Sequence, residues 1–169
     1  VMLNFPLTKV AEKIKKKELS PVELTQEILN KVSDENNEYH TFITVLTDTA
    51  LADAKRLEEE LMQGIYRGAL HGIPISIKDN IAVKNVPRTN GSMIDNNHIC
   101  IEDAYIVERL RQCGAIIIGK TNLDEYANHV VGKNRHYGTI RHPIKEGYSV
   151  GGSSGGSAVS VATNVSFAS

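Results

Sequence analysis

Apolar residues recur at helical spacing along the first third of the chain. Residues 8–18 and 22–32 each place their apolar side chains on one face, which predicts two helices. The motif Ser-Pro-Val-Glu at 20–23 marks the start of the second helix. Serine can cap it, proline suits the first helical position, and glutamate three residues after the cap can close a capping box. The polar run at 33–38 predicts the end of this helix.

After these two helices the sequence predicts a strand and then a third helix. Residues 41–46 are rich in β-branched and aromatic side chains, which predicts a strand. Thr47 or Asp48 is expected to cap a third helix, whose apolar positions continue towards Gly64.

Beyond residue 65, strands and helices alternate. Residues 73–77 predict a strand that carries a proline, and residues 115–119 form a continuous apolar run typical of a strand buried on both faces. Asp103 is expected to cap a helix that Gly114 ends. The remaining expected elements are a short helix at 122–127, a long polar loop at 132–149 and a helix that opens at Gly155.

This order of elements predicts an α/β fold with a mostly parallel or mixed sheet flanked by helices. A length of 169 residues suits one domain. Within it we distinguish a helical part, residues 1–64, from an αβ part that carries the chemistry, residues 65–169. No internal repeat and no linker divides the chain.

Composition excludes several classes of protein. The formal net charge of −1 argues against a nucleic-acid surface. No apolar run is long enough to span a membrane, and no signal peptide is evident. Two cysteines make no disulfide framework, so we expect reduced thiols and a cytoplasmic or organellar-matrix protein. The six histidines lack carboxylate or cysteine neighbours at ligand spacing, so no metal site is expected.

The loop Gly-Gly-Ser-Ser-Gly-Gly-Ser at 151–157 is the first candidate for chemistry. Its glycines allow close approach of a ligand, and its serines present hydroxyl groups without filling the space. A helix that begins at the end of the loop directs backbone N–H groups at negative charge. A phosphate-binding loop and a flexible tether are the alternatives. No Gly-Lys-Ser/Thr follows the loop, which weakens the first, and apolar residues follow at once, which weakens the second.

Lys78 is the second candidate, at the end of the strand expected over residues 73–77. A lysine at a strand end is usually a solvated surface residue. Here the apolar neighbours indicate burial, and a buried lysine loses its proton easily, so that it can act as a base. Asp79 and Asn80 either orient Lys78 or simply end the strand.

Three motifs, in this order, resemble the amidase signature family. They are His-Gly-Ile-Pro-Ile-Ser-Ile-Lys-Asp-Asn (71–80), Gly-Lys-Thr-Asn-Leu-Asp-Glu-Tyr-Ala (119–127) and Gly-Gly-Ser-Ser-Gly-Gly-Ser-Ala (151–158). Ser-Pro-Val-Glu-Leu at 20–24 is also similar to the family, so the resemblance covers nearly the whole chain. Within the family, Asn-Leu-Asp-Glu-Tyr is more similar to the A subunits of glutamyl-tRNA(Gln)/aspartyl-tRNA(Asn) amidotransferases, since general amidases more often have proline where Asp124 stands.

The resemblance implies a Ser–cis-Ser–Lys catalytic triad. Lys78 matches the family's base, and Ser153 matches the bridging serine, which is often held in a cis peptide. Ser154 is the rival candidate for the bridging role. Supporting glycines of the loop are Gly151, Gly152, Gly155 and Gly156.

The resemblance also implies that the nucleophile lies outside this chain. The family's nucleophilic serine stands in a later Gly-Ser/Thr-Asp-Thr-Gly-Gly-Ser-like stretch, and no such stretch occurs up to Ser169. We therefore expect an N-terminal part of an amidase domain, truncated before the fold is complete and inactive as it stands. Four serines are rejected as the nucleophile, namely Ser157, Ser160, Ser166 and Ser169.

For substrate and partners, the resemblance implies glutamine hydrolysis that supplies ammonia to misacylated Glu-tRNA(Gln) or Asp-tRNA(Asn). It implies B and C partner subunits, tRNA bound mainly through a partner, and ATP and magnesium used by the partner rather than by this chain. A departure stands at Tyr126-Ala127-Asn128-His129, where A subunits usually continue Phe-Ala-Met-Gly. The alternatives are a free-standing amidase for small amides and an inactive remnant.

Overall fold

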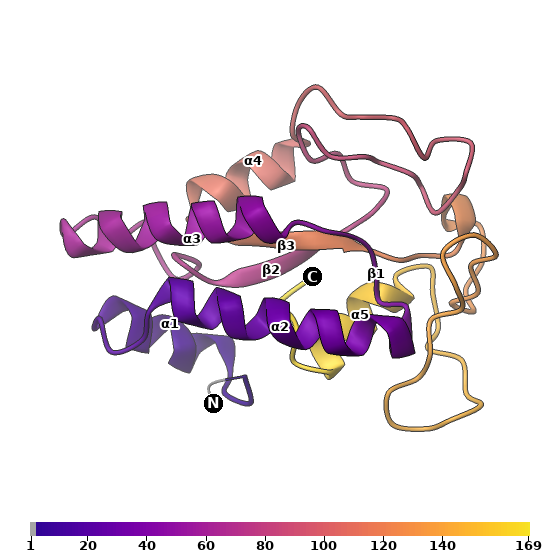
Figure 1. The fold of residues 1–169 in the computed structure, drawn as a ribbon, viewed down its shortest axis with the longest axis horizontal. Coiled ribbons are helices and arrows are strands. Elements are labelled where there is room, and N and C mark those ends of the chain that lie inside the picture. Colours follow the sequence, from indigo (N-terminus) through magenta and orange to yellow (C-terminus); the bar gives the residue numbers. More distant parts are fainter. Residues whose placement is uncertain (1–2) are drawn as a thin grey trace.

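In the computed structural model, which describes residues 3–169, a small sheet lies among helices (Figure 1). The sheet has three strands in the order β1-β3-β2. β1 (Phe42–Val45) pairs antiparallel with β3 (Ile116–Thr121), and β2 (Pro74–Lys78) pairs parallel with β3. The predicted mixed α/β architecture is therefore confirmed.

Helices surround this sheet, and the long loops gather at one end of the molecule (Figure 1). α3 packs on β3 and on α2, while α5 packs on β2 and β3. None of the helices in residues 3–169 has the length and apolar character needed to cross a membrane. The helices are α1 (Leu7–Lys15), α2 (Pro21–Tyr39), α3 (Thr47–Met62), α4 (Tyr105–Gln112), the 3-10 turn η1 (Glu125–Ala127) and α5 (Gly155–Ala162).

The hydrophobic core lies where the central strand meets the helices. β3 is buried along its whole length, as its continuous apolar run predicts. On β2, Ile75 and Ile77 are buried, as is Ile73 just before the strand. Burial of these side chains removes apolar surface from water, which is the main driving force for forming the sheet. It also places the end of β2, where Lys78 stands, at the border of the core.

The start of α2 agrees with the sequence prediction, but its end does not. Ser20 Oγ accepts a hydrogen bond from Glu23 N at 3.1 Å, as expected for a serine cap. The helix continues through the polar residues 33–38 and ends before His40, which has a left-handed φ of 53°. Asn36 stabilises this end, because its side chain binds both the N–H and the C=O of Phe42. The prediction of an end at 33–38 was therefore wrong.

The predicted helix caps, Thr47 or Asp48 for the third helix and Asp103 for the fourth, were also wrong. Thr47 and Asp48 already belong to α3, and the capping position is Leu46. At α4 the capping position is Ala104, while the carboxylate of Asp103 accepts hydrogen bonds from Lys84 N at 2.6 Å and from Arg111 Nε at 3.0 Å. The side chain of Asp103 thus joins α4 to a neighbouring loop instead of closing its first turn.

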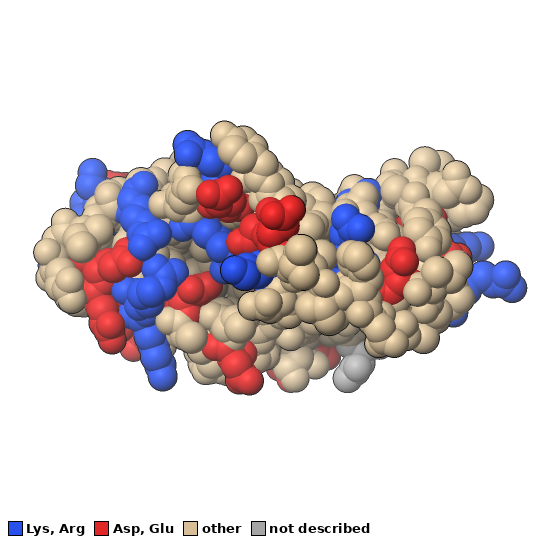
Figure 2. All heavy atoms as spheres, turned by 90° about the horizontal axis from the view of Figure 1, so that it is seen from above, with Lys and Arg blue, Asp and Glu red and all other residues tan. Residues whose placement is uncertain are grey.

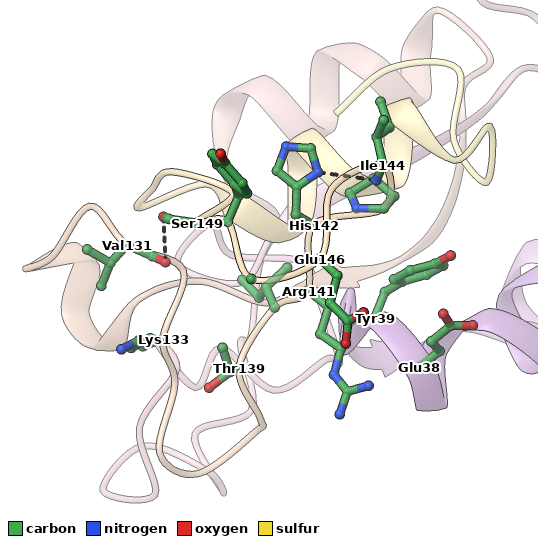
Figure 3. Close-up of a pocket in the computed structure, with 14 residues that line it drawn as sticks. Glu38, Tyr39, Val131, Lys133, Thr139, Arg141, His142, Ile144, Glu146 and Ser149 are labelled. Atoms are coloured by element: carbon green, nitrogen blue, oxygen red, sulfur yellow. Dashed lines mark hydrogen bonds between the residues drawn. The ribbon is translucent and has the colours of Figure 1, made fainter.

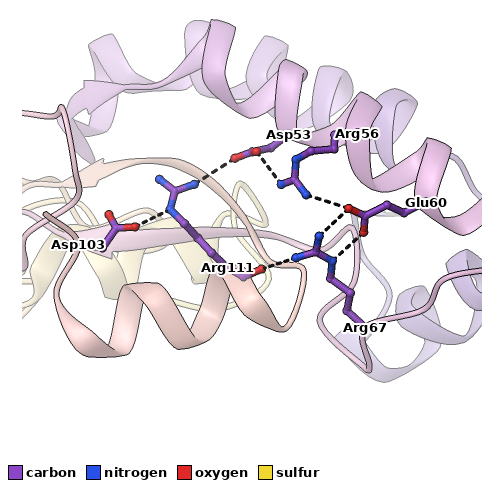
Figure 4. Close-up of polar contacts among 6 residues, drawn as sticks. All are labelled: Asp53, Arg56, Glu60, Arg67, Asp103 and Arg111. Carbon is purple, nitrogen blue, oxygen red and sulfur yellow. Dashed lines mark hydrogen bonds and ion pairs between the residues drawn. The ribbon is translucent and has the colours of Figure 1, made fainter.

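A row of ion pairs connects α4, and the loop that follows α3, to α3 (Figure 4). Arg111 binds Asp53 on α3 at 3.1 Å as well as Asp103 on its own side. Arg67 binds Glu60, also on α3, and its guanidinium donates to the Arg111 backbone carbonyl. These side chains are partly exposed, so the pairs orient the elements more than they stabilise the fold.

The outer edge of β2 is partly covered by the last residues of the chain. Ser76 N donates to the Ala168 carbonyl at 3.1 Å, and Phe167 N donates to the Pro74 carbonyl at 3.2 Å. Residues 167–168 therefore run beside β2 on the side away from β3. This contact brings the end of the chain close to Lys78.

Candidate active site

The carboxyl end of β2 and the Gly–Ser loop meet in the structure, although their residues are far apart in sequence. Lys78 is the last residue of β2 and is half-buried. Its Nζ lies 2.6 Å from Ser153 Oγ, within hydrogen-bonding distance. Of the two serines considered for the bridging position, it is therefore Ser153 that contacts the amine.

The environment of Lys78 favours the neutral amine. Burial lowers the pKa of Lys78 below its ordinary value, and the negative charge of Asp124 acts in the opposite direction. The hydrogen-bond partner is an uncharged hydroxyl, which does not hold the ammonium form as a carboxylate in contact would. A lysine of this kind can take up a proton from a neighbouring hydroxyl.

The loop before α5 presents Ser153 through an unusual backbone. Gly151 has a φ of 76°, and the peptide bond between Gly152 and Ser153 is cis. At the end of the loop, Gly156 lies so close to the backbone of Thr41 and Asn122 that a Cβ on it would overlap both carbonyl oxygens. Gly155 similarly lies against the side chains of Val150 and Ile140. The supporting glycines thus bring the start of α5 against the residues that flank β1 and β3 and against the polar loop.

A pocket of about 400 Å³ opens next to this pair. Its lining includes Lys78, Ser154, Ser157 and Ser169, together with apolar side chains of β2 and α4. The exposed Ser154 precedes the first turn of α5. The structure therefore gathers several hydroxyl groups and the amine around one small cavity.

Other serines of this region are engaged in structural contacts. Ser157 Oγ lies 2.9 Å from Thr121 Oγ1 at the end of β3. Ser160 is buried, where its Oγ lies 3.1 Å from Ser76 Oγ and donates to the Ser157 carbonyl. Ser166 Oγ donates to the Ala168 carbonyl. The contacts of Ser157 and Ser160 join α5 to the sheet, and that of Ser166 lies within the last residues of the chain.

Asp79 has a different partner from the one the sequence suggested. Its carboxylate forms an ion pair with Lys120 at 3.2 Å and accepts hydrogen bonds from the backbone and side chain of Thr89. Asp79 and Lys120 are both fully buried, and Lys120 Nζ also donates to the Pro87 carbonyl. Asn80 is exposed. Asp79 thus ends β2 by binding into the core and makes no hydrogen bond to Lys78.

Two residues of the site region were not predicted from the sequence as site residues. Asp124 drew attention only as a marker of one branch of the family, and Lys120 drew none. Both stand at the carboxyl end of β3 or just beyond it, next to the end of β2 in the parallel pair. Polar residues directly after a buried strand are the signal that could have found them.

A larger cavity of about 850 Å³ lies inside the predicted polar loop (Figure 3). It is lined by residues of the segment 131–149 and by Glu38 and Tyr39 at the end of α2. Hydrogen bonds hold the loop around it. His142 Nδ1 accepts from Ile144 N at 3.2 Å, and Ser149 Oγ donates to the Val131 carbonyl at 2.9 Å. In residues 3–169, no group of His, Cys, Asp or Glu side chains is arranged to hold a metal ion.

The face seen from above carries both signs of charge (Figure 2). Lys and Arg side chains lie interspersed with Asp and Glu over one half of this face, and much of the other half is uncharged.

Comparisons with known proteins identify the family of the chain. A family model described as Amidase matches residues 23–169. The chain belongs to the amidase family. This confirms the resemblance on which the site assignment rests.

The chain is also similar to individual curated relatives and solved structures. The chain is 41% identical to the A subunit of glutamyl-tRNA(Gln) amidotransferase from Desulfotalea psychrophila, over 97% of this chain and 34% of the relative. It is 39% identical to the protein of the same name from Methylobacillus flagellatus, over 97% of this chain and 33% of the relative. The native peptide amidase of Stenotrophomonas maltophilia has a TM-score of 0.89 and 34% identity, over 98% of this chain and 35% of that one. The chain thus spans about a third of the length of these proteins.

Proposed function

We propose that this chain carries the lysine and the bridging serine of an amide-hydrolysing enzyme. The observation that carries the proposal is the 2.6 Å contact between Lys78 Nζ and Ser153 Oγ beside a small pocket. The lowered pKa of Lys78 supports it, because a base has to be neutral before it can accept a proton. Membership of the amidase family makes amide bonds the expected substrate class.

The proposed reaction uses this pair as a proton relay. The neutral amine of Lys78 accepts the proton of the Ser153 hydroxyl, which in turn accepts the proton of a nucleophilic serine. That serine, which we expect among residues that follow this segment in the longer relatives, attacks the amide carbonyl. The C–N bond breaks, ammonia leaves with a proton returned through the relay, and water hydrolyses the acyl-enzyme. Lys78 regains its neutral state at the end of the cycle.

We infer that glutamine is the amide and that the whole protein works as the A subunit of a tRNA-dependent amidotransferase. The relatives that carry this name support the inference, since they align with nearly the whole chain. In that case the B and C subunits would be the partners. ATP and magnesium would be used by a partner, and tRNA would bind mainly through it.

The proposal is tested on protein expressed from the complete reading frame that contains this segment. Glutamine hydrolysis is measured with and without the partner subunits, for the unaltered protein and for Lys78→Ala. Lys55→Ala, which removes an exposed lysine of α3, is the matched control. We expect Lys78→Ala to lose nearly all activity and the control to keep it. An unchanged rate in Lys78→Ala would end the assignment of Lys78 as the base.

A free-standing amidase that acts on small amides is the second candidate. The solved peptide amidase supports it, and so does the departure at residues 126–129. In the structure Tyr126 and Ala127 have positive φ values, and Tyr126 Oη donates to Asp95 at 3.1 Å. Activity on simple amides that does not depend on partner subunits would favour this candidate over the amidotransferase.

A further inference from the structure

A buried carboxylate stands next to the candidate site without a part in the proposed reaction. Asp124 follows β3 and is completely buried. Its two oxygens accept hydrogen bonds from backbone N–H groups, one from Gly132 at 3.0 Å and the other from Lys133 at 3.1 Å. A charged group is costly to bury, so donors to both oxygens are needed to keep it in place. Asp124 thus binds the polar loop 132–149 to the end of β3.

The same residue contacts the backbone that presents Ser153. Asp124 N donates to the Ser153 carbonyl at 3.3 Å. On the other side, Gly152 lies directly against the carboxylate, and a Cβ on Gly152 would overlap Asp124 Oδ2 and the backbone of Val130. Asp124 therefore touches the two residues that determine where the Ser153 hydroxyl lies.

Asp124 also supplies the negative charge that acts on Lys78. Burial lowers the pKa of Lys78, and the charge of Asp124 opposes that change. Two further charged groups near the end of β2, Asp79 and Lys120, form an ion pair with each other, and Arg88 acts on Lys120. The Gly–Ser loop and α5 contain no charged residue, and α4 presents Ile106 and Leu110 to the pocket.

We propose that Asp124 is a positioning residue, which ties the polar loop to Gly152 and Ser153 and so holds the Ser153 hydroxyl against the amine of Lys78. The inference deepens the proposed function and rests on it. It assigns a role to a carboxylate that does not itself touch the substrate. Because the carboxylate is charged, this role has a consequence for pH dependence that packing alone would not have.

The test compares Asp124→Asn with Glu125→Gln in protein from the complete reading frame. Asn keeps the size of the side chain and one acceptor oxygen but removes the charge. Glu125 is the next residue, on η1, where its carboxylate binds His136, so the control removes the same charge outside the site. The rate of amide hydrolysis is measured against pH. In parallel, the pH dependence of Lys78 acetylation by trace acetic anhydride is followed by mass spectrometry.

We expect Asp124→Asn to lower kcat by about 10- to 100-fold, as small misplacements of a catalytic group do. The midpoints of both pH curves should move to lower pH, because loss of a nearby negative charge disfavours the ammonium form of Lys78. Glu125→Gln should change neither quantity. Midpoints that do not move in Asp124→Asn would overturn the proposal, even if the rate falls.

Two further outcomes are distinguished by the design. If Asp124→Asn does not fold, Asp124→Ser is measured in its place, and if neither variant folds, the residue is a determinant of the fold and the positioning role is withdrawn. If the unaltered protein hydrolyses no amide, the proposed function fails. The acetylation curves still decide in that case whether Asp124 acts on the amine.

Discussion

Two lysines stand on neighbouring strands and have opposite surroundings. In the parallel pair of β2 and β3, Ile77 is opposite Lys120 and Lys78 is opposite Thr121, so the lysines are one position apart. Lys120 is completely buried and has the carboxylate of Asp79 at 3.2 Å. Lys78 is half-buried and has the hydroxyl of Ser153 at 2.6 Å.

This contrast teaches that depth of burial alone does not make a base. Burial lowers the pKa of both lysines. At Lys120 a carboxylate in contact compensates the charge, which makes an ion pair suited to holding two strand ends together. At Lys78 the contact is an uncharged hydroxyl that can itself give up a proton. Lys78, the less buried lysine, is therefore the one suited to act as a base, because its partner is the hydroxyl of Ser153.

The largest effect is expected when Lys78 is replaced by a side chain that cannot lose its proton. Arginine is always protonated, so Lys78→Arg should lower the rate of amide hydrolysis by a factor of about 10² to 10⁴, the usual contribution of a general base. The free energy of unfolding should change little, because the position is half-buried and faces the pocket. Steady-state kinetics and urea denaturation measure the two effects. A Lys78→Arg enzyme of normal activity would show that the amine is not the base.

The next effect concerns the buried ion pair. Lys120→Met leaves the carboxylate of Asp79 buried without its cation, and breaking such a pair costs about 3–5 kcal/mol. Urea denaturation should show this loss in the free energy of unfolding, whereas the exposed control Lys55→Met should show none. Adding Asp79→Asn removes the uncompensated charge, and the double variant should regain part of the loss. If Lys120→Met is as stable as its control, the pair does not hold the strand ends.

These two lysines also show what the sequence could and could not predict. Lys78 and Ser153 were predicted because each stands in a local motif, and the structure places them together. Asp79 was considered as an orienting group for Lys78, yet it binds Lys120 and Thr89. The local sequence says that a carboxylate follows the strand but not which cation faces it across the sheet.

Some of the predictions of where helices begin and end were wrong for a similar reason. Asp103 is a good capping residue by type, but its carboxylate is bound by Arg111 and by the Lys84 backbone, and its place is determined by tertiary contacts. In α2 the polar residues 33–38 are compatible with a helix surface, and the Asn36 side chain closes the end only because β1 begins beside it. Asp124 shows the same limit, since its loop partners lie further along the chain.

The third effect is a difference in reactivity between the two amines. Because burial lowers the pKa of Lys78 below its ordinary value, the neutral fraction of this amine rises with pH earlier than that of an exposed lysine. The rate of amide hydrolysis should therefore rise with pH through the same midpoint as acetylation of Lys78. Lys120 should react slowly at every pH in the folded protein, since its side chain is fully buried and ion-paired. Equal labelling of the two lysines would remove the contrast between them.

The smallest effect is expected at the partly exposed ion pairs between α3 and α4 (Figure 4). Arg111→Ala removes the contacts to Asp53 and Asp103, but its side chain is 32% exposed, and pairs of this kind contribute about 0 to 1 kcal/mol. The loss in the free energy of unfolding should shrink further in high salt, because screening weakens exposed pairs more than buried ones. The loss in Lys120→Met should be nearly independent of salt. A loss of several kcal/mol in Arg111→Ala would mean that the surface row, and not the buried pair, is the main ionic support of the sheet and its helices.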